Sequence, residues 1–145
     1  MSLIKRSSFF FLVSLLVLWG APTMTTASDS AHTDIFQFKQ KVRVEVNNVL
    51  SSPVTIHCKS KDNDLGSHVI NAHGLYSFGF NVNFIGTTLF FCGVSLQGKR
   101  VTFDVYKASR DQSRCPHFCE WHVDTNGVEG FKPSAKAPDI VIPWK

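Results

Sequence analysis

The stretch KVRVEVN, residues 41–47, alternates valine with charged or polar residues without interruption. An alternation with a period of two is typical of a β-strand that buries one face, because successive side chains of a strand point to opposite sides. This stretch therefore predicts a strand whose three valines, Val42, Val44 and Val46, pack into a core while Lys41, Arg43, Glu45 and Asn47 face outward.

Six further segments downstream carry the same kind of signal: residues 54–58, 76–82, 89–94, 101–106, 118–123 and 128–131. Asn126-Gly127 supplies a turn signal between the last two segments, so we expect those two strands to form a hairpin. No segment shows a helical period of useful length. Seven or eight short strands separated by turn signals predict an all-β protein, a small antiparallel β-sandwich or a related barrel.

The N-terminal 27 residues have the three parts of a secretory signal peptide. Lys5 and Arg6 precede the apolar run 9–18, and small residues follow up to Ala27. The apolar run is about half of the ~20 residues that a membrane-spanning helix needs. We therefore expect cleavage after Ala27, a secreted protein and no membrane span.

The mature chain divides into three parts by composition. Residues 28–40 are polar and weakly patterned and predict a flexible N-terminal arm, residues 41–131 form the predicted sandwich domain, and residues 132–145 contain three prolines and predict an extended tail without a strand partner. Loss of Lys5 and Arg6 leaves 13 basic against 11 acidic residues, a net charge of +2. Such a small, scattered charge argues against a nucleic-acid-binding protein.

All four cysteines, Cys58, Cys92, Cys115 and Cys119, lie in the mature chain. In an oxidising compartment an even number predicts two disulfides, each worth about 2–4 kcal/mol, with three possible connectivities. Because Cys58 and Cys119 both face inward on their strands, we expect a Cys58–Cys119 bridge in the core and a second bridge from Cys92 to Cys115.

The sequence holds no recognisable catalytic or metal-binding set. His57 adjoins Cys58, but neighbours on a strand point to opposite faces, and the thiol is expected in a disulfide. Cysteines and histidines also cluster in residues 115–122, although a structural zinc site needs a second pair elsewhere. We therefore predict no catalytic residue, no metal and no cofactor.

Asp62, Asn63 and Asp64 faintly resemble a calcium loop, but the distal glutamate and the flanking helices of such a loop are missing. A tight turn, in which the Asp and Asn side chains accept hydrogen bonds from nearby backbone amides, is the better interpretation. Gly66 would then supply a backbone conformation that a β-carbon disfavours.

Several segments in order resemble one plant family. Residues 57–66 read HCKSKDNDLG, and the matches continue in the segments VEVNN, YSFGF, LFFC, FDVY and CEW, which begin at residues 44, 76, 89, 103 and 119. This series, spanning residues 41–131, resembles the plant self-incompatibility proteins, which include the stigmatic S-proteins of poppy and the S-protein homologues. The resemblance implies a secreted β-sandwich with two disulfides and a ligand-like protein, since the best known members are signals recognised by a pollen receptor. The tail after Phe131 departs from the family pattern.

We therefore expect a secreted, monomeric, non-enzymatic recognition protein whose partner is a protein receptor on a cell surface. Polar loops on a rigid scaffold are free to diversify, so the loops 59–66 and 107–114 are the candidate contact sites. The candidate residues in them are Lys61, Asp62, Asp64, Lys107, Arg110, Asp111 and Arg114. The alternative is a secreted effector that perturbs membranes or hydrolyses a substrate weakly, but no amphipathic basic helix supports it.

Overall fold

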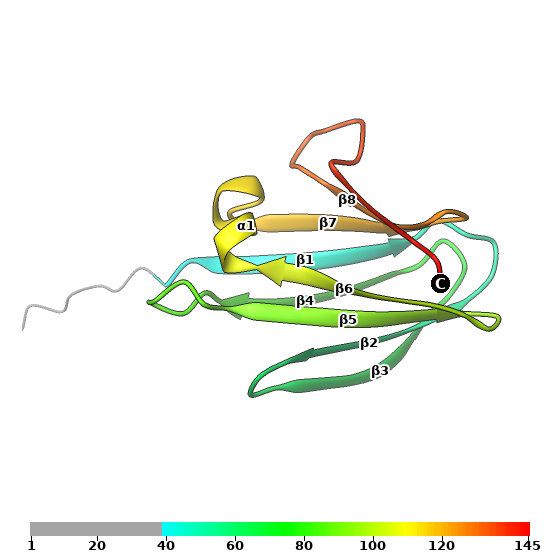
Figure 1. The fold of residues 1–145 in the computed structure, drawn as a ribbon, viewed down its shortest axis with the longest axis horizontal. Helices are drawn as coiled ribbons and strands as arrows, with labels where there is room; N and C mark the ends of the chain where they lie inside the picture. The colour runs from blue at the N-terminus through cyan, green and yellow to red at the C-terminus, as the bar shows by residue number, and fades with distance from the viewer. Residues whose placement is uncertain (1–38) are drawn as a thin grey trace, which may run out of the picture. The chain divides into compact units, whose positions relative to one another are not determined.

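The computed structural model describes residues 39–145, so the predicted signal peptide and residues 28–38 of the predicted arm lie outside the described residues. The described part contains nine strands and one short helix (Figure 1). They are β1 (Lys41–Asn48), β2 (Val54–Ser60), β3 (Asp64–Ile70), β4 (Leu75–Asn81), β5 (Leu89–Leu96), β6 (Lys99–Lys107), α1 (Ala108–Arg114), β7 (Phe118–Val123), β8 (Gly127–Phe131) and β9 (Ile140–Pro143).

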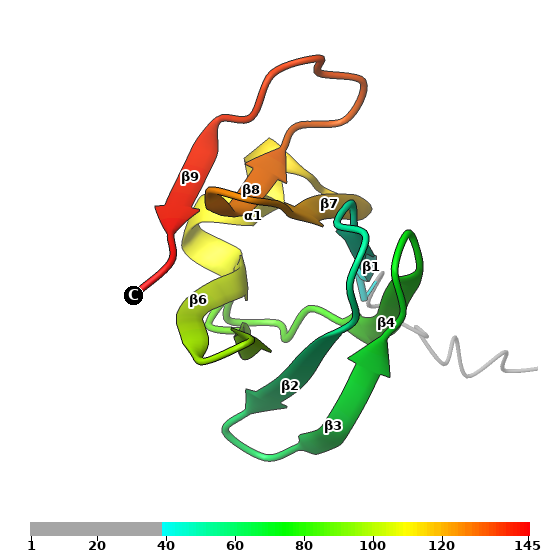
Figure 2. The ribbon, with the colours of Figure 1, turned by 90° about the vertical axis from the view of Figure 1, so that its right-hand side faces the viewer.

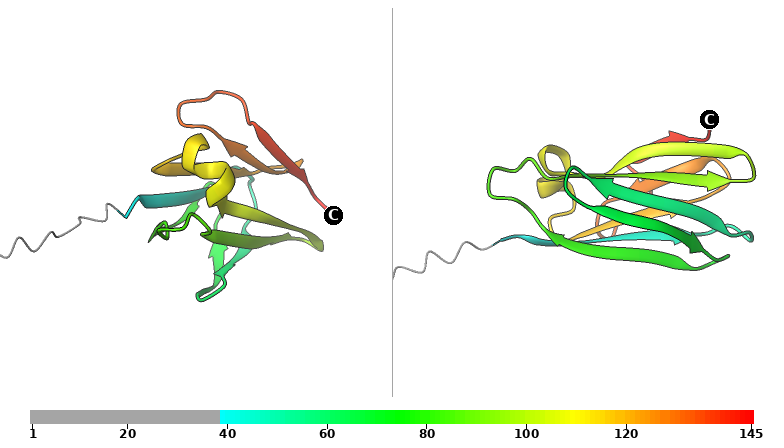
Figure 3. Two further views of the ribbon diagram at one scale, coloured as in Figure 1. Left: turned by 60° about the vertical axis from the view of Figure 1, so that its left-hand side comes forward. Right: turned by 90° about the horizontal axis from the view of Figure 1, so that it is seen from below.

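The strands form two sheets, which confirms the predicted all-β sandwich. One sheet has the order β4-β1-β7-β8-β9 and the other the order β3-β2-β5-β6. Figure 2 shows the strands arranged around the core, and Figure 3 shows the two layers from the side. All neighbours are antiparallel except β1 and β7, which run parallel.

The core is built from the inward positions of the alternating strands. Val42, Val44 and Val46 are fully buried, as their alternation predicts. Trp121 is fully buried on β7, and its indole N–H donates a hydrogen bond of 2.9 Å to the carbonyl of Val105. Aromatic residues fill much of the space between the sheets, including Phe78, Phe80, Phe90, Phe103 and Tyr106.

The expected loop 59–66 is wrong in its extent, because β2 continues to Ser60 and β3 begins at Asp64. Only residues 61–63 form the turn between the two strands. The predicted turn chemistry is confirmed: the Asp64 carboxylate accepts a hydrogen bond of 2.9 Å from the Gly66 amide, and Gly66 has a φ of +78°. The strand was missed because β3 lies at the edge of its sheet and exposes most of its side chains, so it lacks an apolar alternation.

The expected surface loop 107–114 is also wrong, since residues 108–114 form the helix α1. The buried positions of this helix are Ala108, Asp111 and Arg114, spaced three residues apart. Two of these three buried residues are charged. The buried positions therefore repeat with a helical spacing, but the apolar residues of the sequence do not, and the helix could not be predicted from hydropathy.

The predicted hairpin between the last two strands is confirmed by the pairing of β7 with β8. The expectation of a tail without a strand partner is wrong, because β9 pairs with β8. Beyond β9, Lys145 and Arg100 exchange two backbone hydrogen bonds of 3.1 and 3.2 Å, which join the tail to β6 of the other sheet. A four-residue strand ending in proline gives too short a pattern to be read from sequence.

The predicted disulfide pairing is wrong: the structure joins Cys58 to Cys92 and Cys115 to Cys119. Cys58 and Cys92 lie directly opposite each other on the adjacent strands β2 and β5, with Cα atoms 4.0 Å apart. Cys119 does face inward on β7, but the residue that meets it is Cys115, just beyond the end of α1. The strand order, which the sequence did not reveal, therefore decides the connectivity.

Candidate functional site

The candidate contact residues lie at one end of the sandwich. Figures 1 and 3 show the β2–β3 turn, the helix α1 and the β4–β5 turn at this same end. Lys61, Asp62 and Asp64 belong to the β2–β3 hairpin, whereas Lys107 ends β6 and Arg110, Asp111 and Arg114 belong to α1. The two groups have different environments and are described in turn.

The tip of the β2–β3 hairpin is a tightly bonded turn that exposes two charges of opposite sign. The Ser60 amide donates to the Asn63 carbonyl over 2.8 Å, and the Ser60 hydroxyl accepts from the Asn63 amide over 3.1 Å. Between these residues, Lys61 and Asp62 are exposed, and within residues 39–145 neither forms an ion pair. The turn therefore presents both charges to solvent on a fixed backbone.

Asp64, at the base of this tip, is engaged within the hairpin. Its carboxylate lies 2.5 Å from the His57 imidazole and 3.1 Å from the Lys59 ammonium group. The hydrogen bond with His57, followed by those from Gly66 and Lys59, holds the pKa of Asp64 well below its usual range. Asp64 therefore stays ionised and fixes the hairpin.

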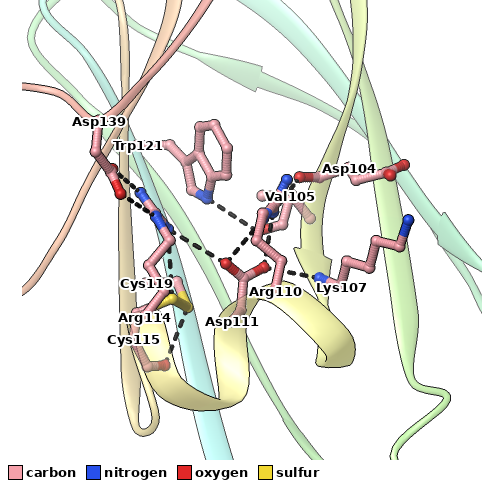
Figure 4. A network of polar contacts seen from close by, with 10 residues as sticks. All are labelled: Asp104, Val105, Lys107, Arg110, Asp111, Arg114, Cys115, Cys119, Trp121 and Asp139. Carbon is pink, nitrogen blue, oxygen red and sulfur yellow. Dashed lines mark hydrogen bonds and ion pairs between the residues drawn. A yellow bond between two sulfur atoms is a disulfide. The ribbon is translucent and has the colours of Figure 1, made fainter.

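The helix α1 is held by a network of charged residues (Figure 4). Asp111 is fully buried and accepts hydrogen bonds from the Lys107 amide (2.8 Å) and from Arg110 Nε and Nη2 (2.9 and 2.7 Å). Arg114 lies 3.4 Å from Asp111 and donates two hydrogen bonds of 2.8 and 2.6 Å to Asp139. Because a buried charge is costly unless it is paired, these contacts are what allow α1 to pack against the core.

The same network shifts the pKa values of Arg114 and Asp139 and places two guanidinium groups near the Trp121 ring. Burial alone would lower the pKa of Arg114, but its hydrogen bonds and ion pairs with Asp139 and Asp111 raise it. Arg114 in turn lowers the pKa of Asp139. The guanidinium carbons of Arg110 and Arg114 lie 5.6 and 5.5 Å from the Trp121 ring centre.

The expectation that residues 107–114 form a contact loop is wrong, because most of their charged side chains are bound within the molecule. Asp111 and Arg114 are buried and cannot reach a partner, and the Arg110 guanidinium is bound to Asp111 and to the Asp104 carbonyl. Only the side chain of Lys107 remains exposed among these four candidates. The interpretation of the segment as solvated surface failed because its polar residues bind one another.

A second exposed feature, the turn between β4 and β5, was missed by the sequence reasoning. Phe84 and Ile85 are 84% and 75% exposed. The turn is closed by its own hydrogen bonds, each of 2.8 Å: the Asn83 amide to the Thr88 hydroxyl, the Asn83 side-chain amide to the Thr87 hydroxyl, and the Thr87 amide to the Asn83 side chain. The signal that could have indicated it is two bulky apolar residues between Asn83 and Gly-Thr-Thr, outside any alternating pattern.

A groove of about 860 Å³ runs between this turn and the β2–β3 tip. Its apolar surface comes from Phe80, Ile85, Leu89, Phe90 and Phe91. Its polar lining comes from Ser60, Lys61, Asp62, Asn63, Asn81, Asn83, Thr87 and Thr88. A lining that mixes apolar and polar side chains suits the capture of an apolar group whose surroundings form hydrogen bonds.

The outer face of the five-stranded sheet carries a further hollow, lined by polar residues that include Glu45, His73, Glu120 and His122. Glu120 and His122 lie 2.9 Å apart, so they form an ion pair when the histidine is protonated. Within residues 39–145, no group of three His, Cys, Asp or Glu side chains is placed to hold a metal ion. No helix in that range is long and apolar enough to cross a membrane.

Comparison with known proteins identifies relatives across nearly the whole described part. Residues 43–144 match the family described as plant self-incompatibility protein S1. The chain is 41% identical to S-protein homolog 6 of Arabidopsis thaliana over 103 residues. This alignment covers 70% of this chain and 75% of that protein. It is 36% identical to S-protein homolog 2 of the same plant over 123 residues, an alignment that covers 81% of this chain and 76% of that protein. Because the family match reaches residue 144, the expectation that the tail departs from the family pattern is corrected.

A solved structure shares the fold. It is a self-incompatibility protein homologue, one of a widespread family described as small, highly stable, secreted proteins from plants. The TM-score is 0.60 at 13% sequence identity, and the match covers 74% of this chain and 97% of that one. At this identity the likeness establishes the sandwich architecture.

Proposed function

This chain belongs to the plant self-incompatibility protein S1 family, and we propose that it is a secreted, non-enzymatic recognition protein that binds a protein receptor on a cell surface. The β2–β3 hairpin is the proposed contact site. Lys61 and Asp62 are its contact residues, and Asp64 is the residue that fixes the hairpin behind them.

Secretion is supported by the N-terminal pattern and by the cysteines. Residues 1–27 have the composition of a signal peptide. All four cysteines of the chain are paired in disulfides, which form and persist outside the cytosol. The structural relative is itself described as one of a family of secreted plant proteins.

The recognition proposal rests chiefly on the exposed, unpaired charges at the tip of the β2–β3 hairpin. Asp64 and the charged residues of α1 are bound to partners within the molecule, whereas Lys61 and Asp62 are exposed and unpaired within the described residues. Their turn is held by hydrogen bonds of Ser60 and Asn63. A preorganised turn loses little entropy on binding, which favours the use of these charges in contact with another protein.

A hydrolase is less well supported by the same geometry. The sulfur of Cys58 is bound to Cys92, and His57 is directed to Asp64 rather than to a nucleophile. Nucleophilic catalysis needs a free nucleophile within hydrogen-bond reach of its base. Membrane perturbation remains the other alternative, and the experiment below includes it.

The test is saturation binding of the fluorescently labelled secreted protein to isolated plant cells. We expect saturable binding that protease treatment of the cells abolishes. Lys61→Ala combined with Asp62→Ala should raise the Kd about thirtyfold, because one interface hot spot is worth about 2 kcal/mol and about 1.4 kcal/mol corresponds to a factor of ten. Lys136→Ala, which removes an exposed charge from the loop between β8 and β9, is the control and should leave the Kd unchanged.

Three results would contradict the proposal. Binding that never saturates would exclude a receptor of limited number. Leakage of vesicles of phosphatidylcholine and phosphatidylserine caused by the protein would favour the membrane alternative. Turnover of ester, glycoside or phosphodiester substrates by the purified protein would favour an enzyme.

A further inference from the structure

Phe84 and Ile85 form an apolar knob, meaning two adjacent large side chains that project from the β4–β5 turn. They are among the most exposed large apolar residues in the described part of the chain, at 84% and 75%. The hydrogen bonds of Asn83 with Thr87 and Thr88 hold the turn in one conformation. Adjacent large apolar side chains that project into water from a fixed turn mark a contact surface, because they gain no stabilisation from burial within the molecule.

The groove described above lies directly beside the knob, since Ile85 is part of its lining. Phe84 is outside that lining and is the more exposed of the pair. The groove volume of about 860 Å³ falls within the range of about 300–1,000 Å³ that ligand pockets occupy. One surface thus carries both an apolar projection and an apolar recess.

We propose that this surface binds a second copy of the same chain. In a two-fold symmetric contact, each copy presents the same patch, so the projection and the recess must both lie on that patch. The knob and the groove satisfy this requirement: Phe84 of each copy would enter the groove of the other, against the rings of Phe80 and Phe91.

The charged residues beside the groove can also pair with the same residues of a second copy. Lys61 and Asp62 are adjacent, exposed and opposite in sign, so a two-fold contact can place the lysine of one copy against the aspartate of the other. The side-chain amides of Asn63 and Asn83 are bonded within their own turns, to Ser60 and Thr87, so the two charges are the chief polar groups that a second copy must satisfy. A patch of this composition can satisfy its polar groups against an identical patch.

An anionic bilayer suits this surface less well than a second copy. Lys61 and Asp62 cancel in charge, so this surface offers anionic headgroups no net attraction. Insertion of the knob would also bring the charges of Lys61 and Asp62, which line the groove and are unpaired within the described residues, toward hydrocarbon, where unpaired polar groups are costly. The polar residues beside the groove therefore favour a second copy of the chain over a lipid bilayer as the binding partner.

The dimer should be weak and dependent on concentration, because the patch occupies only one end of the sandwich. This inference departs from the expectation of a monomer drawn from the sequence. It goes beyond the receptor proposal, although both use the β2–β3 tip. The knob variants below leave Lys61 and Asp62 intact, so the two proposals can fail separately.

The test is sedimentation velocity of the secreted protein from about 1 μM to about 1 mM, the range in which weak contacts titrate. The wild-type mass should rise from that of one chain towards that of two. Phe84→Ser combined with Ile85→Ser should remain monomeric throughout. Val69→Ser is the matched control, because Val69 is 65% exposed on β3 away from the groove, and this variant should dimerise like the wild type.

A charge exchange tests the charged residues beside the groove. Lys61→Glu and Asp62→Lys should each weaken self-association about tenfold, and an equal mixture of the two variants should restore it, because each copy then offers the charge that the other lacks. All these side chains are exposed, so unchanged urea unfolding curves should accompany the loss of dimer.

Three results would overturn the inference. A wild-type protein that stays monomeric at every concentration would show that this surface does not bind a second copy. A dimer that persists in the double serine variant would place the interface elsewhere. Binding of the wild type to phosphatidylserine vesicles that the serine variant lacks, without self-association, would identify a lipid surface as the partner.

Discussion

Trp121 shows how single residues at the α1 end of the molecule depend on one another. Its indole N–H is bonded to Val105, and the guanidinium groups of Arg110 and Arg114 lie over its ring. Across from it on β8, a β-carbon built at Gly130 would lie 2.8 Å from the Trp121 ring and 2.9 Å from Arg114 Nη2. The absence of a side chain at Gly130 is therefore what allows Trp121 and Arg114 to occupy their places.

This contact predicts the effect of Gly130→Ala. A β-carbon does not approach a ring carbon to 2.8 Å, so the buried ring must move, and overpacking of this kind costs about 1–3 kcal/mol of the free energy of unfolding. The measurement is urea unfolding followed by tryptophan fluorescence. Gly79→Ala on β4 is the matched control: its β-carbon would meet only the Val42 carbonyl at 3.5 Å, so this variant should be neutral or slightly stabilised. Equal losses in both variants would contradict the role of Trp121.

The ion pair of Arg114 with Asp139 predicts a dependence of stability on pH. Arg114 lowers the pKa of Asp139 in the folded protein, so the folded state binds this proton less tightly than the unfolded state does. The stabilisation is present above the unfolded pKa of about 3.9 and is lost as the pH falls through the folded pKa. The urea midpoint should therefore fall between about pH 5 and pH 2.

The variant that isolates this contribution is Asp139→Asn. It should be less stable than the wild type at pH 7 and should lose less stability on acidification. Part of the fall should remain, because the pKa of Asp64 is also lowered, chiefly by its hydrogen bond with His57. Asp62→Asn is the control, since the Asp62 carboxylate pairs with no cation in the described chain. A parallel fall in Asp139→Asn and the wild type would contradict the assignment.

At the scale of elements, the two disulfides close loops of very different length. Cys58–Cys92 joins β2 to β5 over a separation of 34 residues, whereas Cys115–Cys119 joins the end of α1 to β7 over a separation of 4. A crosslink restricts the unfolded chain more when it closes a longer loop. The bridge between the strands should therefore contribute more to stability than the bridge beside the helix.

This difference can be measured with two double variants. Replacing Cys58 and Cys92 with alanine should lower the free energy of unfolding by about 4 kcal/mol, and replacing Cys115 and Cys119 should lower it by about 2 kcal/mol. Each variant keeps the other bridge, which serves as its internal control in a non-reducing gel. The reverse order would show that native packing around α1, rather than loop entropy, decides the contribution.

The elements that the sequence predicts are those whose burial follows hydropathy. Strand β1 was predicted within a residue because its valines alternate and all three are buried. The elements β3, α1 and β9 were not predicted, and each buries or pairs its residues by other means. The clearest case is α1, where Asp111 is buried because it pairs with Arg110 and Arg114 of the same helix, and Arg114 is buried because it also pairs with Asp139, 25 residues away, which no hydropathy pattern reveals.

The candidate site shows the same division. Lys61 and Asp62 were named as contact candidates because residues 59–66 are polar and can be read locally as a loop. Phe84 and Ile85 were missed, since large apolar residues are expected inside unless the fold is known to leave them out. Their exposure follows from the arrangement of β4, β5 and the β2–β3 hairpin, and so does the groove between them.

At the scale of the whole molecule, secretion and disulfide pairing can be tested on one sample. Protein recovered from the medium of plant cells that express the whole chain should have the mass of residues 28–145 less four hydrogens, and reduction should restore those hydrogens. Trypsin should then release residues 44–59 crosslinked to residues 62–99, because these peptides hold Cys58 and Cys92.

The remaining cysteines give the control within the same digest. Cys115 and Cys119 fall in one tryptic peptide, residues 115–136, because the bond from Lys132 to Pro133 resists trypsin. That peptide should appear without a partner and gain two hydrogens on reduction. Its crosslinking to either of the other peptides would contradict the pairing. Free thiols, or a chain that still begins at Met1, would remove the argument for an extracellular protein, and with it the proposal of a cell-surface receptor.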